Sequence, residues 1–431
     1  MTEPFPLAPS LWTATAPPAP PTPPLEDSAR ADVCVIGAGY AGLSTALHLA
    51  ERGVRTIVLE AREPGWGGSG RNGGQVIPGL KYDPDELESL FGPERGSRLV
   101  DFAGGAAGVV FDLIARHAMD VPHARAGWIQ GAHSRATVEL VKHRAGQWAR
   151  RGAPVQFLDK AETDRHLGTG QYLAGWIDRR GGAVQPLAYA RGLVRAALAA
   201  GAAVHGASPT TGLERRDGKW IVTTRAGASV TADQVVMCTN AYACGDLWPR
   251  LSRTVIAPNS YQIATAPLSD NVRKSILPFG QVSSDARRLL VYFRLDDQGR
   301  LLVGGRGPSR EPTSDADWAH LEAMLPRLFP QAQGAPIAYR WCGHVAITRD
   351  FLPHLHQPAP GLLIDIGCMG RGIALQTAMG RAMAAYVATG DADALPLPFT
   401  PIRPLPLYGL HNVVTAAFVA WYRFLDRRGM R

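Results

Sequence analysis

The fold of this chain is decided by one stretch near its start, Val33-Cys34-Val35-Ile36-Gly37-Ala38-Gly39-Tyr40-Ala41-Gly42. An apolar run typical of a buried strand leads into three glycines, and a helical pattern follows them. Gly37 permits a tight turn, Gly39 lets backbone amides approach a pyrophosphate, and Gly42 brings helix and strand together. The spacing predicts a dinucleotide site with the phosphates at the N-terminus of the helix.

A second apolar run ends in Glu60, which indicates the kind of nucleotide. Glu60 lies 18 positions after Gly42, close to the roughly 20 positions expected for an acid that binds ribose hydroxyls. A site for NADP would favour an arginine here, because a carboxylate repels a 2′-phosphate. The run therefore argues against NADP.

Size, charge and cysteines bound the class of protein. With 431 residues, 46% of them hydrophobic, the chain can bury the cores of two domains. The net charge of +8 comes from arginines scattered along the chain, so we expect a solvated basic surface and no nucleic-acid partner. The five cysteines form no CxxC pair, which disfavours a disulfide framework or a metal site and fits a cytoplasmic location; they are Cys34, Cys238, Cys244, Cys342 and Cys368.

The chain opens with a proline-rich segment at residues 17–24, which we expect to lie as an extended arm on the body. No apolar run approaches the roughly 20 residues needed to span a membrane, and the N-terminus lacks the basic-then-apolar pattern of a signal peptide. Periodicity predicts helices at residues 101–117, 137–151 and 187–200, and strands at residues 127–130, 175–178, 201–205, 219–224, 228–230, 234–240 and 362–366.

Five short motifs carry a family resemblance, at residues 65–75, 178–182, 238–242, 260–265 and 367–372. Together they resemble the D-amino acid oxidase-like (DAO) family of FAD-dependent oxidoreductases, over nearly the whole chain. Gamma-glutamylputrescine oxidase-like members are the most similar. The resemblance implies an α/β fold in which a split Rossmann-type FAD-binding domain carries a second, mixed-sheet substrate domain.

The domain limits that we expect follow from this resemblance. They are 1–30 for the arm, 31–120, 184–245 and 341–395 for the FAD-binding domain, 121–183 and 246–340 for the substrate domain, and 396–431 for a C-terminal extension.

The loop of residues 65–75 and the junction of residues 367–373 are expected to meet the flavin. Small residues let the loop run against a flat ring system, and the junction directs a positive helix end at the ring, where negative charge gathers on reduction. The residues expected to bind FAD are Gly37, Gly39, Tyr40, Ala41, Gly42, Glu60, Ala61, Gly67, Gly68, Ser69, Arg71, Asn72, Gly73, Gly74, Gln75, Thr210, Asn240, Ala241, Gly370, Arg371, Gly372 and Ile373.

Some relatives link the flavin to a cysteine in the stretch that corresponds to residues 340–348. Cys342 lies one position before the linking residue, and along a strand that points its side chain to the opposite face. We therefore predict non-covalent FAD.

The resemblance implies hydride transfer from the carbon beside a substrate amine to flavin N5, which gives an imine that water hydrolyses. His344 falls in a stretch that approaches the flavin in relatives, and Tyr261 lies on a substrate-domain strand, so both are candidate catalytic residues. A packed imidazole and a core aromatic are the alternative interpretations.

Relatives that hold a small amino acid carboxylate use an arginine and a lysine where this chain has Pro78 and Ala374. An amine, or a substrate whose carboxylate is far from the reacting carbon, therefore fits better than sarcosine. Arg294, Arg306 and Arg349 are alternative anchors that the sequence does not rank.

Residues 411–426 predict a helix with an apolar stripe that includes Val414 and Trp421. Docking on the body of the enzyme is favoured over peripheral membrane contact. Oxygen is the expected acceptor of electrons. The alternatives are a dehydrogenase that reduces a quinone or a carrier, and a non-catalytic FAD-binding subunit.

Overall fold

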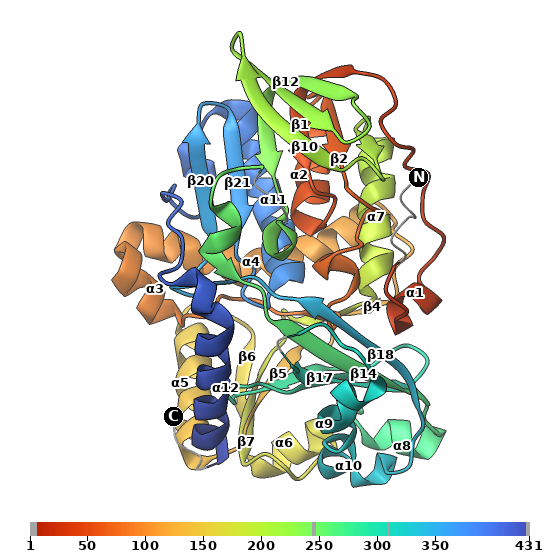
Figure 1. Cartoon of the computed structure of the whole chain (residues 1–431). Helices are drawn as coiled ribbons and strands as arrows, with labels where there is room; N and C mark the ends of the chain where they lie inside the picture. The colour runs from red at the N-terminus through yellow and green to blue at the C-terminus, as the bar shows by residue number, and fades with distance from the viewer. Residues whose placement is uncertain (1–6, 244–246, 309, 428–431) are drawn as a thin grey trace.

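The computed structural model describes residues 7–243, 247–308 and 310–427. Figure 1 shows two large sheets, one in the upper and one in the lower half of the molecule. The upper sheet has the strand order β10-β11-β12-β1-β2-β9, with β21 beside β12 and β20 beside β21. Its strands are β1 (Ala29–Ile36), β2 (Thr56–Leu59), β9 (Ala203–His205), β10 (Thr210–Arg216), β11 (Lys219–Thr224), β12 (Ser229–Met237), β20 (His354–Ala359) and β21 (Leu362–Ile366).

The central pairs of the upper sheet are parallel, and both faces are buried. Strand β1 pairs in parallel with β2 and β12, and β12 pairs in parallel with β21. Val33 and Val35 pack into the helical core, while Cys34 and Ile36 point to the opposite apolar cluster. The strand therefore reads as a continuous apolar run, as strands buried on both faces do.

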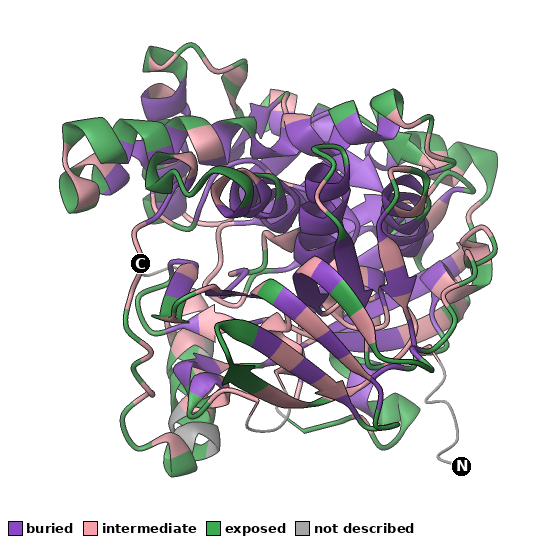
Figure 2. Cartoon of the chain, turned by 90° about the horizontal axis from the view of Figure 1, so that it is seen from above, coloured by how far each residue is buried: buried purple, intermediate pink, exposed green. Residues whose placement is uncertain are grey.

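Helices cover one face of the upper sheet. They are α2 (Tyr40–Ala50), α7 (Pro186–Ala199) and α11 (Gly372–Thr389), with α3 (Pro84–Phe91) and α4 (Pro93–Arg116) beyond them. Figure 2 shows this layer from above, with buried residues gathered at the centre and exposed residues on the outer helices.

The lower sheet is mixed and has the order β18-β14-β17-β16-β15-β5-β7-β6. Strands β5 and β15 are parallel neighbours, and the other pairs are antiparallel. The strands are β5 (Trp128–Ala132), β6 (Val155–Leu158), β7 (Ala174–Asp178), β14 (Asn259–Pro267), β15 (Val282–Asp285), β16 (Tyr292–Leu295), β17 (Arg300–Arg306) and β18 (Ile337–His344). The helices α5 (Arg135–Arg150) and α6 (Lys160–Leu167) pack beside it.

The α/β fold with two mixed sheets is confirmed. The predicted domain limits stay a prediction, and β18 runs across one of them, between residues 340 and 341. The strands expected separately at residues 228–230 and 234–240 form the single strand β12, because the polar residues between them pair with β11 on one side and β1 on the other.

The N-terminal arm is tied to the body at several points. It contains the short helix α1 (Leu11–Thr15), and Trp12 is 1% exposed. The indole Nε1 of Trp12 donates to the carbonyl of Asn72 at 2.8 Å, and Gln185 donates to the carbonyl of Trp12 at 2.9 Å. Arg191 donates to the carbonyl of Pro17 at 2.6 Å.

The helix α12 (His411–Arg427) is the last element of the described chain and lies in the lower half of the molecule in Figure 1. Across residues 7–427 as far as they are described, none of the helices is long and apolar enough to cross a membrane. Four cysteines are free thiols and buried, whereas Cys244 lies outside the described residues, as does the side chain of Val414.

Candidate active site

A cavity of about 2700 Å³ is lined by residues from both sheets and from α12. Pockets for drug-sized ligands hold roughly 300–1,000 Å³. The cavity therefore has room for a dinucleotide and a substrate together.

The first glycine junction forms one wall of this cavity. Gly37 has φ +101°, and a Cβ on Gly42 would lie 1.9 Å from the carbonyl oxygen of Gly37, so the turn admits no side chain at either place. Helix α2 begins after Gly39 without a side-chain cap. Its first turn therefore faces the cavity with amides that can bind an anion, while the amide of Tyr40 donates to Ser69 Oγ at 3.0 Å.

Glu60 ends β2 on the same wall. Its carboxylate accepts hydrogen bonds from the amides of Ala38 at 2.8 Å and Arg62 at 3.0 Å. Burial raises the pKa of Glu60, and these amides oppose that rise. Ala61 and Thr210 line the cavity nearby, so the expected ribose and adenine contacts lie together.

The loop of residues 65–75 lies along the cavity, but its polar side chains are already engaged. Asn72 donates to the carbonyls of Gly68 and Ser69 at 3.0 and 2.9 Å, and its Oδ1 accepts from the amide of Gly74 at 2.9 Å. Asn72 therefore shapes the loop.

Arg71 and Gln75 are engaged in the same way. The Nε of Arg71 donates to the carbonyl of Trp66 at 2.9 Å, and its guanidinium stacks 4.2 Å from the ring of Trp66. Gln75 donates to the carbonyls of Ser283 and Phe293 at 2.9 and 3.1 Å. Both residues still line the cavity, so their expected contact with the cofactor stays a prediction.

The second glycine junction meets the first across the cavity. Helix α11 begins at Gly372 without a side-chain cap, and residues 369–373 line the cavity. Asn240 has φ +46°, and its Oδ1 accepts from the amide of Gly367 at 2.9 Å, which joins the turn after β12 to the second junction. The two uncapped helix starts and the Glu60 carboxylate fit the phosphates, ribose and anionic ring of a flavin dinucleotide.

The predicted cofactor residues fall into two groups. Gly42 and Gly74 lie behind the wall, where Gly42 holds α2 against β1 and the Gly74 carbonyl accepts from Arg294 at 2.9 Å. The rest line the cavity: Gly37, Gly39, Tyr40, Ala41, Glu60, Ala61, Gly67, Gly68, Ser69, Arg71, Asn72, Gly73, Gln75, Thr210, Asn240, Ala241, Gly370, Arg371, Gly372 and Ile373.

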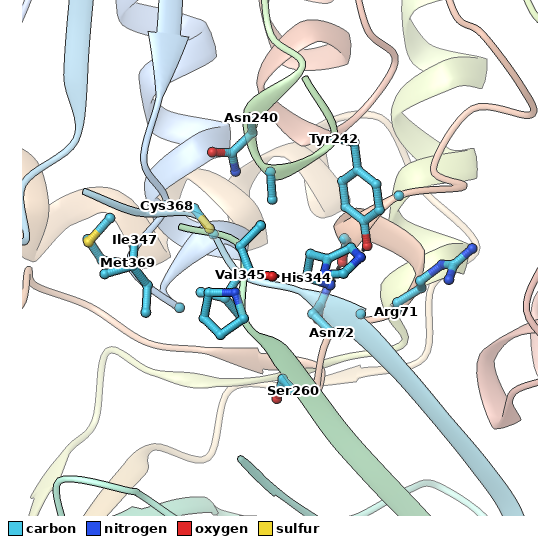
Figure 3. A pocket seen from close by; sticks show the side chains of 18 of the residues that line it. Arg71, Asn72, Asn240, Tyr242, Ser260, His344, Val345, Ile347, Cys368 and Met369 are labelled. Carbon is cyan, nitrogen blue, oxygen red and sulfur yellow. Dashed lines mark hydrogen bonds between the residues drawn. The ribbon is translucent and has the colours of Figure 1, made fainter. Parts of the chain in front are cut away.

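His344 lies in the cavity, as Figure 3 shows, between Tyr242 and Val345. Its Nδ1 lies 3.0 Å from the carbonyl oxygen of Ala257, and its Nε2 lies 3.1 Å from Glu311 Oε1. Both ring nitrogens therefore lie within hydrogen-bond distance of an oxygen atom, which holds the imidazole in place on the cavity wall.

Tyr261 is placed away from the cavity, which corrects the expectation of a catalytic role. It is 0% exposed, packs 5.1 Å from the ring of Trp318, and donates to the carbonyl of Arg310 at 3.1 Å. Side chains alternate along a strand, so its neighbours Ser260 and Gln262 are the ones that line the cavity.

Tyr292 is a site residue that the sequence did not reveal. Its hydroxyl lies 2.9 Å from Ser260 Oγ on the cavity wall. A Cβ at Gly304 would lie 2.1 Å from the ring, and one at Gly73 would lie 2.7 Å from it. The ring therefore fills the space between the flavin loop and the lower sheet, and the Gly304-Gly305 pair is the signal for it.

The three arginines considered as alternative anchors for a substrate carboxylate differ in their position relative to the cavity. Arg306 and Arg349 line the cavity. Arg294 instead donates to the carbonyls of Gly74 and Val184 at 2.9 and 2.7 Å, so its guanidinium supports the loop. Arg294 as a substrate anchor is therefore wrong.

Cys342 lies in the apolar core of the lower sheet, opposite Tyr261 in the β14 pair. Burial raises the pKa of its thiol to about 11. The described part of the chain contains no cluster of three or more His, Cys, Asp or Glu side chains that could hold a metal ion.

Residues 32–386 match the family model described as FAD dependent oxidoreductase (DAO). The chain is 31% identical to a probable oxidoreductase, OrdL, of Haemophilus influenzae, over 94% of both chains. It is also 31% identical to the gamma-glutamylputrescine oxidoreductase of Escherichia coli, over 94% of this chain and 95% of that one. Among solved structures, the glycine oxidase of Geobacillus kaustophilus is similar with a TM-score of 0.71 at 21% identity, over 87% of this chain and 100% of that one.

Proposed function

Because the chain belongs to the DAO family of FAD-dependent oxidoreductases, we propose that it oxidises the C–N bond of an extended amine of the gamma-glutamylputrescine kind, with oxygen as electron acceptor. Family membership already makes it an FAD-dependent enzyme that acts on amines or amino acids. The substrate and the acceptor are the parts that we add.

FAD supplies a hydride acceptor at its N5 atom when it is bound. The first turn of α2 would hold the pyrophosphate, Glu60 would accept hydrogen bonds from the ribose, and the start of α11 would offer positive potential to the ring. Tyr292 and Ser260 wall the space beside the loop, which excludes water and orients the carbon that gives up the hydride.

The substrate amine must be neutral before its neighbouring carbon can release a hydride. His344 lies on the cavity wall, where its ring nitrogens contact the carbonyl of Ala257 and the carboxylate of Glu311. We infer that the amine binds as its free base, and kcat/KM should rise about tenfold per pH unit below the pKa of an alkyl amine, roughly 10.

The observation that carries the substrate class is the absence of the carboxylate clamp. The carbonyl of Pro78 accepts from Arg371, and Ala374 is 1% exposed in the helical core. A compact α-amino acid would lose charge-assisted bonds, each about 1.5–3 kcal/mol, beside the ring. An extended amine draws on apolar contact instead, at about 0.8 kcal/mol for each buried methylene.

Anaerobic flavin reduction tests the substrate class. Gamma-glutamylputrescine should reduce the enzyme with a kcat/KM at least about tenfold higher than that of sarcosine, glycine or D-alanine. Equal efficiency on sarcosine would mean that another cation, such as Arg349, holds a small carboxylate, and the extended-amine assignment would fail. A protein whose flavin no amine bleaches would be a binding subunit.

One feature favours a quinone as a second candidate acceptor. The face of α12 that points outward exposes Val413 by 69%, Trp421 by 55% and Phe424 by 40%, as on a helix that touches a membrane. Reoxidation of the reduced enzyme by oxygen and by a soluble quinone, compared by stopped flow, separates the two acceptors.

A further inference from the structure

Three cations from distant parts of the sequence lie on the wall of the cavity. Lys81 precedes α3, Arg144 lies on α5, and Arg371 directly precedes α11. Arg371 lies over Trp128 and Arg144 donates to Gln130, both on β5 in the lower sheet, and Lys81 lies near both guanidinium groups. The three cations therefore lie on the side of the cavity next to the lower sheet.

Two carboxylates act on these three charges, because Asp83 pairs with Arg144, and Asp83 and Asp178 both oppose the lowering of the pKa of Arg371. The Nε of Arg144 pairs with Asp83 Oδ1 at 2.7 Å, and Nη1 donates to Gln130 Oε1 at 3.0 Å. Arg371 donates to the carbonyl of Pro78 and lies 5.4 Å from the ring centroid of Trp128.

Lys81 lacks even a neutral partner. Within residues 7–243, 247–308 and 310–427, neither Lys81 nor Arg371 forms an ion pair, and the ammonium of Lys81 has no hydrogen bond. Lys81 is exposed to the cavity. The surrounding protein and the two nearby guanidinium groups lower the pKa of Lys81, and burial lowers the pKa of Arg371 to about 10. Such a wall carries uncompensated positive charge that an anion would neutralise.

We propose that Lys81, Arg144 and Arg371 bind a carboxylate at the end of the substrate remote from the oxidised amine. This inference rests on the proposed function, because it requires one substrate to carry both groups. Pro78 and Ala374 cannot form the carboxylate clamp of the relatives, and these three cations would form one farther along the cavity. A clamp at that distance would select substrates that are long enough to reach it. A guanidinium offers two parallel donors to a carboxylate, and the lysine adds a third charge-assisted bond.

The test compares Lys81→Met with Lys142→Met, a matched change at an exposed lysine of α5 outside the cavity. The measured quantity is the ratio of kcat/KM for gamma-glutamylputrescine to that for N-butyrylputrescine, which lacks the carboxylate. The ratio should fall roughly tenfold to hundredfold in Lys81→Met, stay unchanged in Lys142→Met, and return largely in Lys81→Arg. A ratio unchanged in Lys81→Met would overturn the proposal.

A binding measurement separates this inference from the proposed function. Gamma-glutamylbutylamide carries the carboxylate and lacks the oxidisable terminal amine, so its Kd for the holoenzyme can be measured by calorimetry. Lys81→Met should weaken it at least about tenfold. If the wild type binds this ligand but no amine bleaches its flavin, the subsite stands and the proposed function fails. If Lys81→Met releases FAD, the cations serve the cofactor and the subsite is wrong.

Discussion

The buried carboxyl group of Asp365 makes the free energy of unfolding depend on pH. It lies on β21 at 1% exposure, and burial raises its pKa from 3.8 to about 7. Between these two values the unfolded chain ionises and the folded chain does not, so this residue lowers the free energy of unfolding as pH rises through the window, and the penalty is complete above about pH 7.

Asp365→Asn should therefore stabilise the protein at pH 8, by on the order of 2–4 kcal/mol, and give almost no gain at pH 4. Urea unfolding at the two pH values measures the difference. Equal gains at both would mean that the substitution acts through packing and not through the charge.

Cys342 decides how the flavin is held. Its thiol lies in the core behind β18 with a raised pKa, which leaves little thiolate to attack a ring edge. Acid precipitation of the holoenzyme should leave all of the flavin in the supernatant, both for the wild type and for Cys342→Ser. Flavin in the wild-type pellet that disappears in the variant would establish a covalent link.

At the scale of elements, the N-terminal helix α1 acts on the flavin loop. Trp12→Phe keeps an aromatic ring and removes the hydrogen bond from Nε1 to the carbonyl of Asn72. The loss of about 0.5–1.5 kcal/mol should weaken FAD binding roughly twofold to tenfold, measured by the recovery of flavin fluorescence on dilution.

Trp220→Phe is the matched control for this experiment. It removes one hydrogen bond from a buried indole to the carbonyl of Pro360, on the upper sheet and outside the cavity wall. Equal weakening of FAD binding in both variants would show that α1 contributes only general stability.

The sequence predicted the glycine junctions because they depend on local geometry. Gly37 and Gly42 occupy places where a side chain would clash, and any chain with this turn must meet that demand. Tyr261 was assigned wrongly because β14 is buried on both faces, so alternation along the strand does not say which face borders the cavity. Lys81 and Arg144 lie far apart in the sequence, and nothing local marks their approach.

At the scale of the whole molecule, cofactor and fold should depend on each other. FAD binds the folded chain, so it stabilises it by RT ln(1 + [L]/Kd), about 2.7 kcal/mol at a hundredfold excess over Kd. Glu60→Arg removes the carboxylate that we propose as the ribose acceptor, together with its hydrogen bonds from the amides of Ala38 and Arg62.

This variant should purify largely without flavin absorbance and should gain little in Tm when FAD is added. Glu139→Arg makes the same charge change at an exposed position of α5 and should keep its flavin. Full flavin absorbance in Glu60→Arg would show that Glu60 is not needed to bind the ribose.

The residues that line the cavity come from almost every part of the chain, from Leu7 to Asp426. A ribosome adds roughly 5–20 residues per second, so tens of seconds pass between the synthesis of the first wall and that of the last. The glycine turn at α2 is complete early, but the ring-facing junction and α12 follow only near the end. A nascent chain therefore lacks the ring-facing wall until residues 369–373 have been made, and we expect FAD to bind fully only after that point.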